Sequence, residues 1–134
     1  MFKLGMLSKS RLRGVHPDLV RVVTKAITLS DVDFRVLEGV RTLARQRELV
    51  EAGASHTMRS RHLTGHAVDL GALMYGSIRW DWPLYSKIAY AMKMASGIEQ
   101  VPIEWGGDWI TFKDGPHFQL PHDKYPADEF GGPV

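Results

Sequence analysis

The 134-residue sequence has the length of one domain with a single hydrophobic core, and its 44% hydrophobic and 24% charged residues exclude a disordered chain. Because it holds no cysteine, disulfides, thiolate metal sites and cysteine nucleophiles are excluded as well. The formal net charge is only +2. Lysine and arginine concentrate in the first half, but no recognition motif for nucleic acid accompanies them, so we interpret most as solvated surface charges and expect no nucleic-acid partner.

The first half of the chain alternates between helical and β-type patterns. Apolar residues recur at helical spacing behind Pro17, which predicts an amphipathic helix over residues 17–29. Residues 34–41 are rich in β-formers and predict a strand. Thr42 then suits the N-cap of a second helix, which we expect to run through about Glu51.

The middle of the chain predicts a loop, a short strand and a helix. Residues 54–63 are polar and irregular, as in a loop, and they lead into a strand expected over residues 66–70. Helical spacing returns over residues 83–96. Gly97 is expected to end that helix, since glycine is the usual residue beyond a helix C-terminus.

Two short apolar segments close the pattern and decide the fold class. Residues 101–105 and 117–120 are separated by turn-forming residues, including Gly106-Gly107, and predict antiparallel strands. Early helices followed by short strands with tight turns favour an α+β fold with a small antiparallel sheet flanked by helices. We expect a single domain and a monomer over residues 1–134, with an irregular tail from about residue 121.

The sequence offers no addressing or membrane signal. Its first residues show neither a long apolar core nor a small-residue cleavage site, and no segment approaches the roughly 18 apolar residues of a membrane helix. We therefore expect no signal peptide and no integral membrane segment, and accumulation in the cytoplasm.

The stretch from Ser60 to Asp69 carries the most chemical information. Along a strand over residues 66–70, alternation sends Ala67 and Asp69 to one face and His66 to the other. His62 lies in the preceding loop and can turn toward Asp69. An ordinary hydrogen-bonded pair of His62 and Asp69 is the alternative.

A turn further along the chain supplies a third candidate ligand. Gly115-Pro116 forces a tight bend between Asp114 and His117, so both side chains can reach one centre. A catalytic zinc usually takes three protein ligands and leaves a fourth position for water. We therefore predict one zinc ion on His62, Asp69 and His117, with Asp114 as the general base. The other histidines are interpreted as ordinary hydrogen-bonding or surface residues: His16, His56, His66 and His122.

Three further residues are candidates for substrate contacts. Arg41 can stabilise the oxyanion of amide hydrolysis, and the alternative is a surface arginine paired with Glu38 or Glu48. Ser60 is expected to orient a ligand or bind substrate. Trp105 is a candidate for lining the substrate groove, with core packing as the alternative.

These residues carry a family resemblance. The SxHxxGxAxD signature of the LAS metallopeptidases, which include D-alanyl-D-alanine metallopeptidases and hedgehog-like proteins, matches at fixed positions: Ser60, His62, Gly65, Ala67 and Asp69. The chain is also similar to phage endolysins of the L-alanyl-D-glutamate peptidase type, through further blocks: Glu38-Gly39-Val40-Arg41-Thr42, Gln46, Glu104-Trp105-Gly106-Gly107-Asp108-Trp109 and Asp114-Gly115-Pro116-His117-Phe118-Gln119. The resemblance implies a hedgehog and D,D-peptidase-like fold, the same zinc ligands and base, and a role for Arg41 in holding the substrate carbonyl or intermediate.

The resemblance also implies a function. It is that of a phage or prophage endolysin, a zinc endopeptidase that cuts the stem peptide of bacterial peptidoglycan between L-alanine and D-glutamate. Such an enzyme would wait in the host cytoplasm and reach the periplasm or cell wall only at lysis. One alternative is a D-alanyl-D-alanine carboxypeptidase of the same fold. The other is a noncatalytic zinc protein that binds the cell wall, against which the presence of Asp114 argues.

Overall fold

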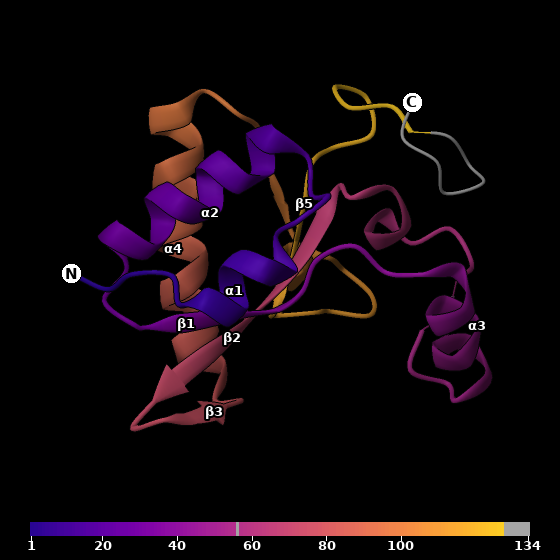
Figure 1. Cartoon of the computed structure of the whole chain (residues 1–134), viewed down its shortest axis with the longest axis horizontal. Helices are drawn as coiled ribbons and strands as arrows, with labels where there is room; N and C mark the ends of the chain where they lie inside the picture. The colour runs from indigo at the N-terminus through magenta and orange to yellow at the C-terminus, as the bar shows by residue number, and fades with distance from the viewer. Residues whose placement is uncertain (56, 128–134) are drawn as a thin grey trace.

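The computed structural model describes residues 1–55 and 57–127, and it has an α+β fold (Figure 1). The helices are α1 (Met6–Arg11), α2 (Pro17–Leu29), α3 (Leu43–Glu51), α4 (Trp82–Glu99) and the short 3₁₀ turns η1 (Arg61–Thr64) and η2 (Gly106–Asp108). The strands are β1 (Phe34–Glu38), β2 (Ala67–Met74), β3 (Ser77–Arg79), β4 (Glu104–Trp105) and β5 (His117–Gln119). His56 and the end of the predicted tail lie outside the described residues.

The strands form one antiparallel sheet with the order β1-β2-β5-β4, and β3 pairs with the last residues of β2. Helices α2 and α4 pack together on one face of this sheet, whereas α3 lies apart, at the other end of the molecule (Figure 1). The predicted small antiparallel sheet with flanking helices is therefore confirmed. Among the described residues, no helix combines the length and the hydropathy needed to span a membrane.

Side chains on the two faces of the sheet lie in different surroundings, as the alternation in β2 predicts. Val68 and Leu70 are fully buried in the core, where they meet the apolar faces of α2 and α4. Phe118 of β5 joins them from the neighbouring strand. Asp69 lies between Val68 and Leu70 on β2, and His117 precedes Phe118 on β5, so both point to the opposite face, away from the core.

The predictions for the first half are largely confirmed. Helix α2 occupies the predicted residues, and the Thr42 hydroxyl caps α3 by accepting a hydrogen bond from the Arg45 amide at 3.1 Å. The strand expected over residues 34–41 ends earlier, at Glu38. Its pairing with β2 shifts register just before that residue, so Arg41 lies in the bend that leads into α3 and not at the end of the strand.

The end of α4 differs from the prediction. Gly97 does not stop the helix, which continues to Glu99 and closes at Gln100 in the left-handed conformation, with φ 57°. Two interactions with Ser96 hold this end, because its carbonyl accepts from the Val101 amide and its hydroxyl donates to the Val101 carbonyl. Val101 is buried, so its apolar contact fixes where the helix closes.

Two further elements were not predicted, and one turn was misplaced. Helix α1 and strand β3 have no clear sequence signal. The turn that joins β2 to β3 consists of Tyr75 and Gly76, both at positive φ, and tyrosine is not a usual turn residue. The Gly106-Gly107 pair does not form a hairpin turn. It forms η2, and the chain then runs on to a turn at residues 115–116 before β5.

Candidate active site

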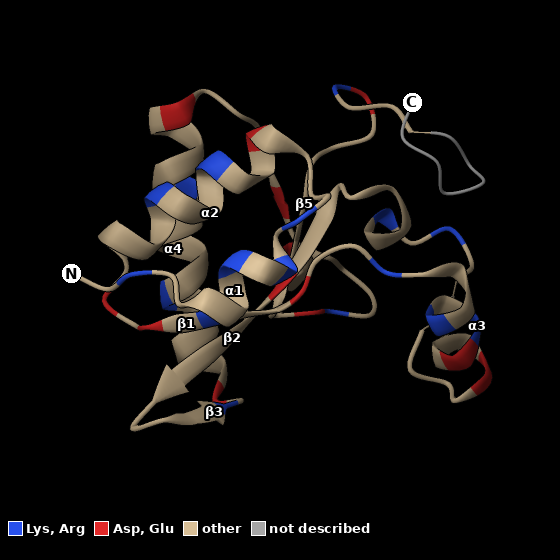
Figure 2. Ribbon diagram, viewed as in Figure 1, with Lys and Arg blue, Asp and Glu red and all other residues tan. Residues whose placement is uncertain are grey.

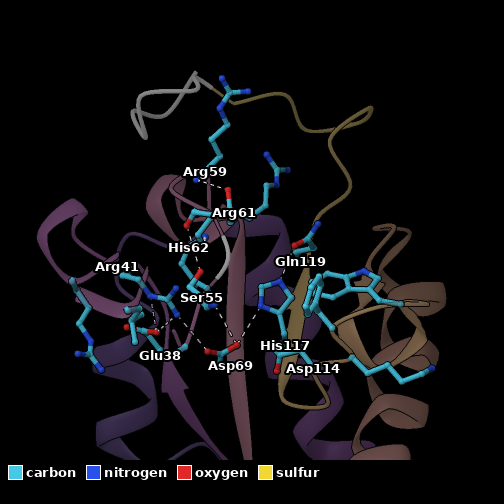
Figure 3. A pocket seen from close by; sticks show the side chains of 18 of the residues that line it. Glu38, Arg41, Ser55, Arg59, Arg61, His62, Asp69, Asp114, His117 and Gln119 are labelled. Carbon is cyan, nitrogen blue, oxygen red and sulfur yellow. Dashed lines mark hydrogen bonds and ion pairs between the residues drawn. The ribbon is translucent and has the colours of Figure 1, made fainter. Parts of the chain in front are cut away.

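Three side chains from separate segments meet at the face of the sheet opposite the core (Figure 3). Asp69 on β2 pairs directly with His117 on β5 in the antiparallel register, and His62 reaches them from η1. Asp69 Oδ1 lies 3.2 Å from His62 Nε2 and 3.3 Å from His117 Nδ1. All three candidate ligand atoms lie within 4.8 Å of one another, so this cluster could bind a metal ion.

The far nitrogen of each histidine ring is already engaged. His62 Nδ1 donates to the Gly39 carbonyl at 2.8 Å, and His117 Nε2 donates to Gln119 Oε1 at 2.7 Å. In neutral imidazoles the nitrogens that face Asp69 therefore carry no hydrogen. Two nitrogen lone pairs and a carboxylate oxygen converge on one point, and only a cation or extra protons can satisfy them. Such donors, with their second nitrogens fixed by hydrogen bonds, fit a metal of the zinc type.

The interactions within the cluster favour an ionised Asp69. Burial alone would raise the pKa of Asp69, but the hydrogen bonds that His117 and His62 donate when their rings carry the extra proton outweigh burial and hold that pKa below its usual range. Burial alone would lower the pKa of His117, but the hydrogen bond to Asp69 outweighs it and raises that pKa. Asp69 is therefore an anion at neutral pH and available as a ligand.

Asp114 approaches the cluster through the turn that precedes β5. The His117 amide donates to the Asp114 carbonyl at 3.2 Å, which closes the predicted bend at Gly115-Pro116. The Asp114 side chain lines the same cleft as the cluster and lies next to His117 (Figure 3). Burial and then the charge of Asp69 raise the pKa of Asp114, so this carboxyl binds a proton more readily than an ordinary aspartate.

Glycine is required where the chain passes Asp114. A Cβ on Gly106 would lie 2.4 Å from the Asp114 carbonyl oxygen, and one on Gly107 would lie 2.3 Å from the Trp105 ring. The Asp114 amide donates to the Gly106 carbonyl at 3.0 Å, so the close approach is also a hydrogen bond. The Gly-Gly pair therefore positions the candidate base.

Arg41 is held beside the cluster by hydrogen bonds to the partly buried Glu38 and the buried Gln46. Its guanidinium donates to Glu38 Oε1 through Nε, at 2.9 Å, and through Nη2, and to Gln46 Oε1 at 2.7 Å. Nη2 also lies 3.7 Å from Asp69 Oδ2. The side chain is only 9% exposed, so the alternative of a surface arginine does not hold, although the pairing with Glu38 that it included is present. Glu48 pairs with Arg45 instead.

Of the other two predicted substrate residues, one lines the cleft and one does not. The Ser60 hydroxyl caps η1 by accepting from the His62 amide at 3.2 Å, and Ser60 also lines the cleft, so it is placed to orient a ligand. Trp105 does not line the cleft. It is buried in the core, stacks on Phe118 and donates from its indole nitrogen to the Gly115 carbonyl at 2.6 Å, so it supports the turn before His117.

The cleft itself has a volume of about 860 Å³. The sheet face with the cluster forms its floor, and residues from α3, the segment before η1 and the segment 109–114 form its walls. Trp109, which was not predicted, is part of this lining, with its ring 5.1 Å from that of His117. Basic side chains also line it, and Lys and Arg occur on α1, α2 and α3 as well, so positive charge is not confined to the cleft (Figure 2).

Sequence reasoning missed the groups that support the ligands. Gln119 and the Gly39 carbonyl orient the two histidines, and Gln46 joins Arg41 to Ser55. Gln46 and Gln119 stand inside the sequence blocks shared with phage peptidases, and this was the only signal for them.

Comparison with known proteins assigns the family. The family model described as phage L-alanyl-D-glutamate peptidase matches residues 1–120. The chain belongs to this family. Two L-alanyl-D-glutamate peptidases are similar in sequence. That of Escherichia phage T5 is 31% identical over 84% of this chain and 85% of its own length. That of Listeria phage A118 is 37% identical over 75% of this chain, which spans only 34% of the phage protein.

Solved structures agree with the family assignment. The crystal structure of the Serratia marcescens L-Ala D-Glu endopeptidase ChiX is similar with a TM-score of 0.89 and 53% identity, over 94% of this chain and 95% of that one. The vancomycin-resistance D,D-dipeptidase VanXYg is similar with a TM-score of 0.52 and 21% identity, over 82% of this chain and 53% of that one, which shows the shared fold alone. The predicted family, the D,D-peptidase-like fold and the enzyme class are confirmed.

Proposed function

We propose that this member of the phage L-alanyl-D-glutamate peptidase family is a zinc endopeptidase that hydrolyses the L-Ala–D-Glu bond in the stem peptide of bacterial peptidoglycan. The observation that carries the proposal is the convergence of His62 Nε2, Asp69 Oδ1 and His117 Nδ1 in one cleft with Asp114. These three atoms would hold one zinc ion. When bound, zinc acts as a Lewis acid on the scissile carbonyl and makes water a stronger nucleophile at neutral pH.

Asp114 is proposed as the general base. It lines the cleft beside the cluster, and its raised pKa suits a carboxylate that accepts a proton from the attacking water and later returns it to the leaving amine. Since zinc is expected to use three other side chains, the Asp114 oxygens stay available for proton transfer. The same residue therefore acts in both halves of the reaction.

Arg41 is proposed to bind the substrate carbonyl oxygen. A guanidinium has five N–H donors, and contacts with Glu38 and Gln46 use three of them, from Nε, Nη1 and Nη2. The remaining Nη donors sit at the cleft beside Asp69, in a fixed orientation. Fixed donors of this kind stabilise the negative charge that develops on the carbonyl oxygen during amide hydrolysis.

The biological setting belongs to the same proposal. A peptidase of this family encoded by a phage or prophage would act as an endolysin, released from the host cytoplasm to the periplasm or wall at lysis. We propose that residues 1–134 work as one monomeric catalytic domain. Ser60 lines the cleft and is proposed to contact the substrate, whereas Trp105 is buried in the core and has no such role.

Digestion of purified peptidoglycan tests the function. Zinc-loaded protein is incubated with the polymer, and new peptide termini are identified by mass spectrometry, with chelator-treated protein as the control. New N-terminal D-glutamate and C-terminal L-alanine are expected. Loss of terminal D-alanine alone would instead favour a carboxypeptidase, and tight binding without cleavage would favour a noncatalytic wall-binding protein.

A further inference from the structure

Arg61 is a buried cation whose hydrogen-bonding capacity is only partly used. It precedes His62 in η1, is 4% exposed, and lines the same cleft as the metal-type cluster. Its Nη2 donates to the carbonyls of Leu120 at 2.9 Å and Tyr125 at 2.7 Å. Nε and Nη1 are buried and have no hydrogen-bond partner among the described residues.

This arrangement costs free energy unless a ligand completes it. Arginine keeps its charge in proteins, and a buried charge without a matching anion is strongly unfavourable. Within residues 1–55 and 57–127, Arg61 has no carboxylate at ion-pair distance, although Glu104 acts on it from further away. Burial lowers the pKa of Arg61, which reflects the same lost hydration.

Other cations of the cleft are engaged differently. Arg41 is bound by Glu38 and Gln46, and Arg45 pairs with Glu48. Lys113 donates to the Gly107 carbonyl at 3.3 Å. Arg61 combines deep burial with unused donors that are closed to solvent in this conformation, so an incoming anion gains a strong, desolvated contact once the Arg61 side chain turns toward the cleft.

The substrate of the proposed reaction carries a suitable anion. Glutamate has two carboxyl groups, and because only one continues the peptide, the residue that follows the scissile bond keeps a free carboxylate. We infer that Arg61 is a substrate-binding residue that holds this free carboxylate through its Nε or Nη1 donors. The inference rests on the proposed function, and it explains why a cation is buried in the wall of this cleft.

Two synthetic stem peptides test the inference. Both contain the L-Ala–D-Glu bond, and in one the free carboxylate of D-glutamate is converted to a carboxamide. Wild-type zinc-loaded protein should cleave the acid with a kcat/KM about tenfold or more above that of the amide, as expected for a hydrogen bond between charged groups. In Arg61→Gln the preference should fall to about twofold or less, with the loss mainly in KM.

Controls separate binding from a structural role. Arg61→Lys keeps the charge and should retain part of the preference, whereas Arg79→Gln, which removes an exposed arginine on β3 that pairs with Asp81, should retain all of it. Equal losses for both peptides in Arg61→Gln would show that Arg61 only anchors Leu120 and Tyr125. Equal cleavage of both peptides by wild-type protein overturns the inference even if no Arg61 variant folds. If neither peptide is cleaved, the proposed function itself fails and the inference falls with it.

Discussion

Asp114 is the residue whose role separates a peptidase from a protein that merely binds metal. Replacing it with alanine should leave zinc binding unchanged, because the three expected ligands are other side chains. Hydrolysis should slow by about 100- to 10,000-fold, the usual contribution of a general base. Zinc content and the rate of peptide cleavage are measured on the same preparation. Asp108→Ala is the matched control, since that aspartate lies in the neighbouring η2, is exposed and pairs with Lys93 of α4. Full activity of Asp114→Ala would assign the base elsewhere.

Replacing Gln119 tests whether zinc binding depends on the hydrogen bond that orients His117. Its Oε1 accepts from His117 Nε2, and its Nε2 donates to Glu104 Oε1 at 3.3 Å, so the amide fixes which histidine nitrogen faces Asp69. Gln119→Leu should weaken zinc binding by about 10- to 100-fold, as is typical when a ligand loses its outer hydrogen bond. Titration against a competing chelator measures this. Unchanged affinity in a folded variant would mean that the β2–β5 pairing alone orients His117.

The residues of the site were predictable to different degrees. The position of Asp69 at the site follows from strand alternation, and that of His117 follows from the Gly-Pro turn, because both signals are local. Gln119 could not be assigned a role, since its contact depends on the register that places Asp69 opposite His117. Trp105 was misassigned because an aromatic residue beside two glycines has the same local pattern in a groove and in a core.

At the scale of elements, the errors occur where tertiary contacts outweigh local preference. A glycine near the end of an apolar helix predicts a C-terminus, yet α4 passes Gly97 because buried Val101 fixes the closing turn two residues beyond Glu99. Strand β1 stops before Arg41, where its pairing with β2 shifts register and the backbone of Gly39 packs so closely on α1 that a Cβ would lie 2.1 Å from the Arg11 carbonyl oxygen. Neither contact is visible in the sequence.

The continuous helix α4 makes a stability prediction. Gly97 is helical and a Cβ there would meet nothing within 4 Å. Gly97→Ala should therefore raise the free energy of unfolding by about 0.5 to 1 kcal/mol, because alanine loses less conformational entropy in a helix. Urea unfolding of the two proteins measures the difference.

Gly65→Ala is the matched comparison for that prediction. Gly65 closes η1 at φ +77°, and an added Cβ would lie 2.5 Å from the Gly14 carbonyl oxygen. The same substitution should therefore destabilise the protein here. A gain in stability at Gly65, or a loss at Gly97, would contradict the assigned backbone conformations.

On the scale of the whole molecule, one face of the sheet contributes to stability and the other carries the candidate active site. One face is closed by α2 and α4 and supplies the core, and the other carries the cluster and opens into the cleft. His66 lies outside both, between Thr64, whose hydroxyl it hydrogen-bonds at 2.6 Å, and the ring of His16. It is 5% exposed, and burial, followed by the charges of Arg61 and two histidines, lowers its pKa to about 4.

That buried histidine should make folding sensitive to mild acid. In the unfolded chain His66 takes up a proton below about pH 6.5, whereas the folded protein resists it until about pH 4, so the unfolded state binds more protons in between. Stability should therefore fall as the pH drops through this window, by up to about 3 kcal/mol for the whole shift. Urea unfolding of metal-free protein at pH 7 and 4.5 measures the slope without competition between zinc and protons.

His66→Gln should remove most of this loss of stability between pH 7 and 4.5. His122→Gln, which replaces an exposed histidine, should leave most of the loss in place. An equal slope in wild type and His66→Gln would place the acid sensitivity in other groups.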